Sequence, residues 1–249
     1  MRKRVRGAGL GLPQSPAPFL WDTGHVYSDR IKAVVSTAER KILSRLASPR
    51  LIQDYLDKLP INFETDGETY MSPRRVFRTK TAHCFEGALV AAAAFAYHGQ
   101  KPLLLDLKTA SIDEDHVVTL FMWNGRWGAI SKTNHVTLRY RDPVYASPRE
   151  VAMSYFHEYY WWNGKKTLRS FSLPFDLSKF SPESWVTPEE DLFWLTEKLD
   201  SSKHIAVATP KQLRSLRDAT RFEIKTTYPS EWPDPAKGQK DQKGQSDGK

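Results

Sequence analysis

The residue best suited to do chemistry is Cys84, the single cysteine of the chain. It precedes a run of small and apolar residues, 85–97, that has the length and composition of a buried helix. Backbone N–H groups at the start of a helix stabilise a thiolate, and so does a nearby imidazolium. The position of Cys84 therefore favours a nucleophile, although a lone cysteine in a folded protein is more often a small core residue.

A thiol nucleophile needs an imidazole that another element of the fold brings to it. His116 begins a predicted strand after the helix and one intervening strand, and we expect it to face the helix start. His83 fits less well because it is the sequence neighbour of Cys84 and should not reach the thiol with good geometry. His98 lies at the far end of the helix, and His135, just past the next hairpin, is a weaker alternative.

The segments after the helix have the pattern of an antiparallel sheet. Gly99 is placed to end the helix, and residues 101–108 form an apolar run typical of a buried strand. Residues 115–123 and 126–131 are two further strand-like runs, separated by Asn-Gly, a strong signal for a tight hairpin. Helices followed by an antiparallel sheet indicate an α+β fold.

The flanking sequence predicts further elements around this core. Residues 29–47 have helical periodicity, residues 48–60 form a helix capped by Ser48, and residues 61–83 form a long polar connection. The later segments are predicted as helix at 147–162, extended at 166–175, helix at 187–199, strand at 204–209, helix at 210–219 and extended at 221–228. We divide the chain into a basic arm at 1–20, a core at 21–146, an appended α/β region at 147–229 and a disordered tail at 230–249.

The motifs around the cysteine resemble a known family. The sequences "HCFEGALVAAAAFAYHGQKPLLLDL" and "DHVVTLFMWNGRWGAIS", with the lead-in "SPRRVF", look like the core of the transglutaminase-like superfamily of papain-like thiol enzymes. The resemblance covers roughly residues 48–135. In that family a helix carries Cys at its N-terminus, a strand carries His and the next strand carries Asp. The resemblance implies that Cys84 is the nucleophile and His116 the base that returns its proton to a leaving amine.

The third catalytic position departs from the family pattern. The place of the family's Asp falls on Ser131. A serine can accept a hydrogen bond from the imidazole and set its tautomer, but it cannot stabilise an imidazolium as a carboxylate does. Asn134 is the second candidate, because an asparagine has this role in papain-like enzymes. Asp115 should point to the opposite face of the strand from His116.

These residues support two classes of function. The first is a thiol-dependent amide hydrolase or acyltransferase that acts on a peptide or protein and needs no cofactor. Water as the acyl acceptor would give a protease or amidase, and a lysine amine would give a cross-linking enzyme. The second is a transglutaminase-like domain that has lost its third catalytic residue and binds a peptide or protein partner.

Composition narrows the choice of partner. The net charge of +8 favours acidic partners in general, but the basic residues stand in short scattered groups without a nucleic-acid motif. We therefore expect no nucleic-acid partner. One cysteine excludes an internal disulfide and a zinc site of several thiolates. We also expect a cytoplasmic protein, because no stretch reads as a secretory signal or a membrane span.

Several other charged and aromatic residues could have either a functional or an ordinary structural role. The acidic loop Asp113, Glu114 and Asp115 could bind calcium, but such loops are usually solvated, and we predict no metal site. The basic residues that precede the cysteine, Arg74, Arg75 and Arg78, could favour an acidic substrate, and a solvated basic loop is the simpler interpretation. The aromatic residues Trp123 and Trp127, and His157 with its aromatic neighbours, are interpreted as packing rather than as binding groups.

Overall fold

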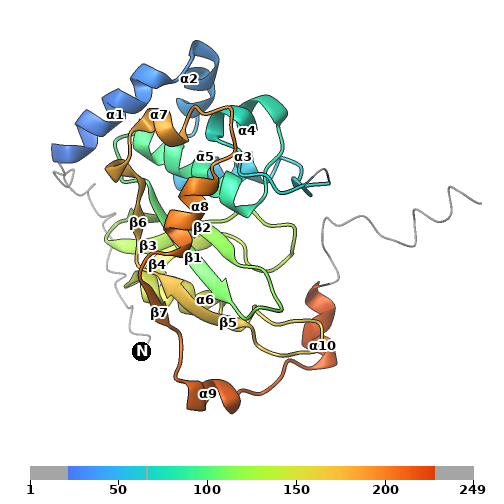
Figure 1. Cartoon of the computed structure of the whole chain (residues 1–249). Helices are drawn as coiled ribbons and strands as arrows, with labels where there is room; N and C mark the ends of the chain where they lie inside the picture. The colour runs from blue at the N-terminus through green and yellow to red at the C-terminus, as the bar shows by residue number, and fades with distance from the viewer. Residues whose placement is uncertain (1–21, 66, 228–249) are drawn as a thin grey trace, which may run out of the picture.

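The computed structural model describes residues 22–65 and 67–227. The predicted arm and tail, at 1–20 and 230–249, lie outside them. The described chain forms an α+β fold built on a sheet of seven strands, all paired antiparallel (Figure 1). The strand order is β4-β3-β2-β1-β5-β7, with β6 paired to β1. The strands are β1 Leu103–Thr109, β2 His116–Trp123, β3 Arg126–Ile130, β4 Arg141–Tyr145, β5 Leu168–Ser172, β6 Phe175–Asp176 and β7 His204–Ala206.

The helices of the first half precede the sheet, and those of the second half alternate with its outer strands. The β2–β3 hairpin turns at Asn124 and Gly125, which both have positive φ, as the Asn-Gly signal predicts. The helices are α1 Asp22–Val34, α2 Thr37–Leu43, α3 Pro49–Leu56, α4 Pro73–Thr79, α5 Cys84–Tyr97, α6 Pro148–Tyr155, α7 Pro182–Trp185, α8 Phe193–Asp200, α9 Pro210–Arg214 and α10 Arg221–Ile224.

Helix α5 covers one face of the sheet, packed against β2 and β1 and surrounded by α1 to α4 (Figure 1). It is apolar on all sides and its central residues are fully buried, as expected of a helix that is enclosed rather than laid on a surface. The Thr119 hydroxyl on β2 donates to the Ala88 carbonyl of α5 over 2.6 Å. Alanine side chains let the helix approach the sheet closely.

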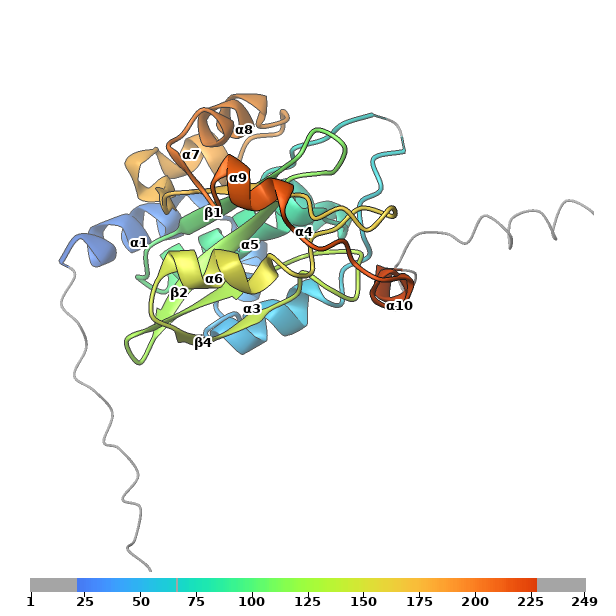
Figure 2. The same cartoon turned by 90° about the horizontal axis from the view of Figure 1, so that it is seen from below.

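Helix α6 packs on the opposite face of the sheet, where Figure 2 shows it in front of the strands. Alternation along β1 separates the two cores, because Leu104 faces the α5 side while Leu105 and Leu107 belong to the cluster under α6. The α6 side of that cluster consists of Val151, Ala152, Tyr155 and Phe156. Both faces of the central strands are therefore covered.

The later part of the chain is built into the same sheet. Strand β5 pairs with β1, and β7 pairs with β5, so the region that follows residue 147 supplies three of the seven strands. Helix α7 also contributes to the α5 core: Trp185 is fully buried and its indole N–H donates to the Tyr27 hydroxyl over 3.0 Å. Helices α1 and α7, from distant parts of the chain, thus meet beside α5.

Several of the predicted elements were wrong in detail, and the helices predicted at 147–162 and 210–219 end early, at Tyr155 and Arg214. The segment 29–47 is two helices, because Ser36 caps α2 in a capping box with Glu39 that interrupts the periodicity. The connection 61–83 contains α4, which Ser72 caps. The helix expected at 187–199 begins at Phe193 as α8, and the segment expected to be extended at 221–228 contains α10, which Thr220 caps. Within residues 22–65 and 67–227, no helix is both long and apolar enough to cross a membrane.

A buried hydrogen bond between Asp106 and His204 ties the outer strand β7 to β1 across β5. Asp106 is only 4% exposed, and its Oδ2 lies 3.0 Å from Nε2 of His204. The Asp106 amide donates to the Ser172 hydroxyl over 2.9 Å. Burial raises the pKa of Asp106 to about 6, although the hydrogen bond from His204 opposes the rise. Ionisation of this carboxyl therefore opposes folding.

We predict that Asp106→Asn removes a pH-dependent part of the stability. The folded protein keeps the Asp106 proton to higher pH than the unfolded chain does. The stabilisation is therefore present below the unfolded pKa of about 3.9 and lost as pH rises through about 6. Urea unfolding from pH 4 to 7 should show this decline in the wild type and less of it in the variant. The exposed control Asp29→Asn should retain the wild-type profile, and equal profiles for Asp106→Asn and wild type would contradict the prediction.

We predict that Gly87→Ala destabilises the protein, although alanine is the better helix former by about 1 kcal/mol. A Cβ at Gly87 would lie 2.5 Å from Cβ of Lys132, which is buried against this turn of α5. Because the overlap involves the base of the Lys132 side chain, the backbone must shift, at a cost of about 1–3 kcal/mol. Thermal and urea unfolding measure the change, and a variant as stable as the wild type would contradict the packing.

Candidate active site

The site begins at the N-terminus of α5, which starts at Cys84 as predicted. His83 is the residue before the helix, in an extended conformation with φ −93° and ψ −170°. The carboxylate of Glu86 accepts a hydrogen bond of 3.0 Å from the backbone N–H of His83 and so caps the helix start. Cys84 thus lies in the first turn of the helix, where unpaired backbone N–H groups favour a negative charge.

The structure places His116 at the first position of β2, where its side chain is buried. Nε2 of His116 lies 2.8 Å from the hydroxyl oxygen of Ser131. The Ser131 hydroxyl donates to the Leu138 carbonyl, so its oxygen accepts the Nε2–H of His116. This arrangement assigns the proton to Nε2 and leaves Nδ1 as the nitrogen available to Cys84.

Ser131 is held in place by a residue that the sequence analysis missed. Gln53 of α3 donates from Nε2 to the Ser131 carbonyl over 2.8 Å and accepts the Ser131 amide at Oε1 over 3.0 Å. Ser131 is only 2% exposed, so this paired contact replaces the water that would otherwise satisfy its backbone. The available signal was a glutamine beside Ile52 on the apolar side of the predicted helix at 48–60.

The other candidates for the third position lie apart from this hydrogen bond. Asn134 is half-buried in the loop after β3, and in the described structure no hydrogen bond joins it to His116. Nδ1 of His135 is buried without a hydrogen-bond partner among the described residues. Burial lowers the pKa of His135, and the charge of His116 lowers it further.

His83, which was expected to reach the thiol only with poor geometry, lies close to it in the structure. Nδ1 of His83 lies 4.0 Å from Sγ of Cys84. The extended backbone at the residue before α5 turns the ring back over the first turn of the helix. Nε2 of His83 lies 2.8 Å from the Thr69 carbonyl, 3.4 Å from Oε1 of Glu86 and 3.8 Å from Oε1 of Glu64. Two imidazoles therefore approach one thiol.

Both imidazoles change the acidity of the thiol. Burial alone raises the pKa of Cys84, but hydrogen bonds to His116 and His83 and their charges lower it well below the usual range. Burial has the opposite effect on the imidazole and lowers the pKa of His83, but Cys84, Glu86 and the Thr69 carbonyl raise it to about 9. At neutral pH the site therefore favours a thiolate beside an imidazolium.

The arginines before the cysteine do not present free positive charge to this site. Each is paired with a carboxylate from another segment, which removes the basis for an acidic substrate. The pairs are Arg74 with Glu39 at 2.8 Å, Arg75 with Asp191 at 2.6 Å and Arg78 with Glu189 at 2.7 Å. They hold α4 against α2 and against the segment before α8.

The acidic loop before β2 is also engaged in local contacts. Asp113 accepts a hydrogen bond from the Thr167 hydroxyl, and Asp115 accepts the Thr109 amide and hydroxyl. The carboxylates of Asp115, Asp106 and Asp200 lie close together, within 4.8 Å. Lys108 pairs with Asp200, and His204 forms a hydrogen bond with Asp106, so these carboxylates already have partners.

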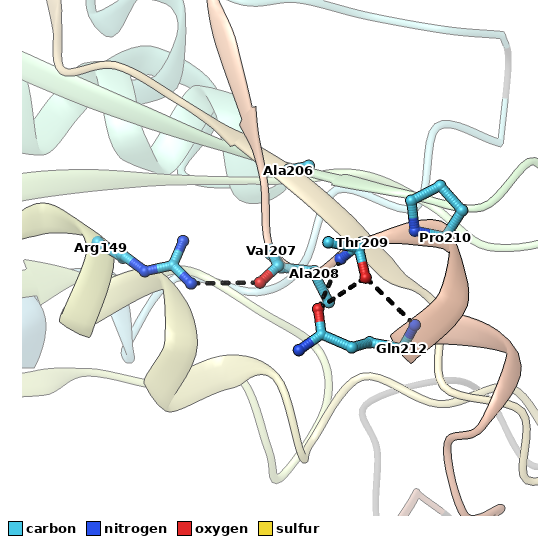
Figure 3. A pocket seen from close by; sticks show the side chains of 7 residues that line it. All are labelled: Arg149, Ala206, Val207, Ala208, Thr209, Pro210 and Gln212. Carbon is cyan, nitrogen blue, oxygen red and sulfur yellow. Dashed lines mark hydrogen bonds between the residues drawn. The ribbon is translucent and has the colours of Figure 1, made fainter.

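The remaining candidates have structural environments. His98 ends α5 and its Nε2 lies 2.9 Å from the Leu43 carbonyl, while His157 is exposed and stacks edge-on against Phe156. In the hairpin, Trp127 pairs with Met122 and Tyr145 across the sheet, and Trp123 is half-exposed opposite Arg126. A shallow pocket at the start of α6 and the β7–α9 connection, lined by Arg149, Val207 and Gln212 among others, includes none of the thiol-site residues (Figure 3).

No known protein-family model matches the sequence, and the search of curated proteins finds no match either. The fold and the geometry of the site therefore stand without support from a relative. What the structure defines is an α+β fold whose one thiol starts a buried helix beside two imidazoles.

We predict that Ser131→Ala destabilises the protein by about 1–3 kcal/mol, because it leaves Nε2–H of His116 and the Leu138 carbonyl buried without a partner. Urea unfolding measures the loss. The exposed hydroxyl of Ser44 bonds only within its own turn, so Ser44→Ala is the control and should change stability by about 0.5 kcal/mol or less. Equal effects of the two substitutions would argue against the His116–Ser131 hydrogen bond.

Proposed function

We propose that the protein is a thiol-dependent amide hydrolase or acyltransferase of the transglutaminase-like type. Cys84 is the nucleophile, and His116 takes and returns its proton, with Ser131 setting the tautomer of the imidazole. The observation that carries the proposal is the thiol at the start of α5, with Nδ1 of His83 4.0 Å from its sulfur and with His83 and His116 both lowering its pKa. A thiol that served only as core packing would have no such partners.

The proposed reaction follows from this arrangement. The thiolate of Cys84 attacks the carbonyl carbon of an amide, and backbone N–H groups at the start of α5 stabilise the oxyanion. The C–N bond then breaks, the leaving amine takes a proton from Nδ1 of His116, and a thioester remains. Water or a second amine attacks the thioester, gives its proton to His116 and releases the thiolate. The substrate of this proposal is a peptide or protein.

A second candidate function is a binding module that retains the cleft of such an enzyme. The hydroxyl of Ser131 at the position where the family carries a carboxylate favours it, because a hydroxyl stabilises an imidazolium less. This candidate requires an unreactive thiol, whereas the enzyme requires a thiolate near neutral pH. The reactivity of Cys84 therefore separates the two.

We expect iodoacetamide to modify Cys84 rapidly well below pH 8.5, and His116→Ala to shift this reactivity to higher pH, because His116 stabilises the thiolate. The chain has one cysteine, so intact mass reports the reaction at a single site. A screen of peptide amides, with water or a lysine amine as the acceptor, should then show turnover that Cys84→Ser abolishes. An ordinary thiol pKa in the wild type and the variant would favour the binding module.

A further inference from the structure

The two imidazoles beside Cys84 have different support. His116 is buried and its Nε2–H contacts a neutral hydroxyl, that of Ser131. His83 has carboxylate oxygens of Glu86 and Glu64 at 3.4 and 3.8 Å from its Nε2. A carboxylate behind an imidazole stabilises its charged form, and a hydroxyl does so far less. Among the described residues, His116 therefore has no carboxylate beside its Nε2, whereas His83 has two.

The ring of His83 is fixed in one orientation. The Thr69 carbonyl at 2.8 Å and the two carboxylates near Nε2 are all acceptors, so Nε2 carries a proton. Nδ1 then faces Sγ of Cys84 over 4.0 Å, and in the charged ring it donates to the thiolate. Tyr70 contacts the same ring edge-on, with the centroids 6.0 Å apart, which limits its rotation.

The buried carboxylate of Glu86 explains why a charge is needed here. Glu86 is fully buried, and its oxygens accept hydrogen bonds from the Asn62 amide, the Thr69 hydroxyl and the backbone N–H groups of Met71 and His83. Buried charges in proteins are balanced by an opposite charge as well as by hydrogen bonds. The His83 ring, 3.4 Å away, is the group positioned to provide it.

We propose that His83 is a second catalytic residue, whose imidazolium is held charged by Glu86 and stabilises the thiolate of Cys84 through Nδ1–H. Glu86 is the positioning residue that acts through His83. The proposal rests on the proposed function, because it assumes that Cys84 reacts as a thiolate. His116 remains the residue that exchanges protons with the substrate, while His83 keeps its proton throughout.

The titratable groups that face His83 come from three segments. Cys84 and Glu86 lie on α5, Glu64 and Tyr70 on the connection before α4, and His116 on β2 acts on the same thiol. Glu114, just before β2, also interacts with Cys84 and His83. Three carboxylates thus surround the imidazolium and the thiolate. We expect the charge of His83 to persist to about pH 9, where its raised pKa lies.

The test is the pKa of the Cys84 thiol, measured from the pH dependence of iodoacetamide modification and from thiolate absorbance. We predict that His83→Gln raises it by about one unit or more, as expected for the loss of a charge in contact with the thiolate, and that Glu86→Gln raises it in the same direction. The control is His98→Gln, which removes an imidazole at the far end of the same helix, where it contacts the Leu43 carbonyl and the Tyr97 ring. His98→Gln should leave the thiol pKa unchanged.

The outcomes separate this inference from the proposed function. A thiol pKa near 8.5 in the wild type contradicts the proposed function and this inference together. In the alternative outcome, the wild type has a low thiol pKa that rises in His116→Ala. If that pKa then rises by less than one unit in His83→Gln, the inference is overturned and the proposed function stands. If His83→Gln does not fold, ring NMR of the full-length His116→Ala protein decides. A histidine that titrates above pH 8 supports the inference, and titration of every histidine below that pH overturns it.

Discussion

The structure depends on the burial of α5 between the sheet and the helices of the first half of the chain. Its alanines give it little side-chain volume, so β2 can approach closely enough for Thr119 to donate to the Ala88 carbonyl. Gly87 removes even the methyl group at the point where Lys132 passes. A helix that is covered on every side has only its ends available for function, and the thiol stands at one of them.

Electrostatics at that end follow from the same burial. The polar groups near the start of α5 have lost water, so each must be satisfied by the protein. Glu86 draws the loop residues Asn62, Thr69 and Met71 to the helix start, and Gln53 fixes the backbone of Ser131 beneath His116. The carboxylate and the hydroxyl thereby lie behind different imidazoles. Thiol chemistry at this site would divide charge stabilisation and proton transfer between His83 and His116.

Local sequence signals worked where one element decides its own conformation. The Asn-Gly turn, the Ser48 cap and the start of α5 at Cys84 all depend on residues within a few positions of one another. The errors arose where two signals competed. Apolar periodicity extended a single helix through the Ser36 cap, and the polar composition of residues 61–83 concealed the Ser72 cap that starts α4.

The sequence by itself determined the α+β class and the cysteine at a helix start, because both follow from periodicity, whereas for the partner of His116 it left Ser131 and Asn134 as alternatives. Only the tertiary structure decided that the chain after residue 147 completes the same sheet, that Gln53 anchors Ser131 and that His83 contacts the thiol. These are contacts between segments far apart in the chain, or they depend on the direction in which one backbone residue turns its side chain. Neither property is encoded in residue spacing, since spacing along the chain fixes neither the packing partner nor the backbone angles at the end of a helix.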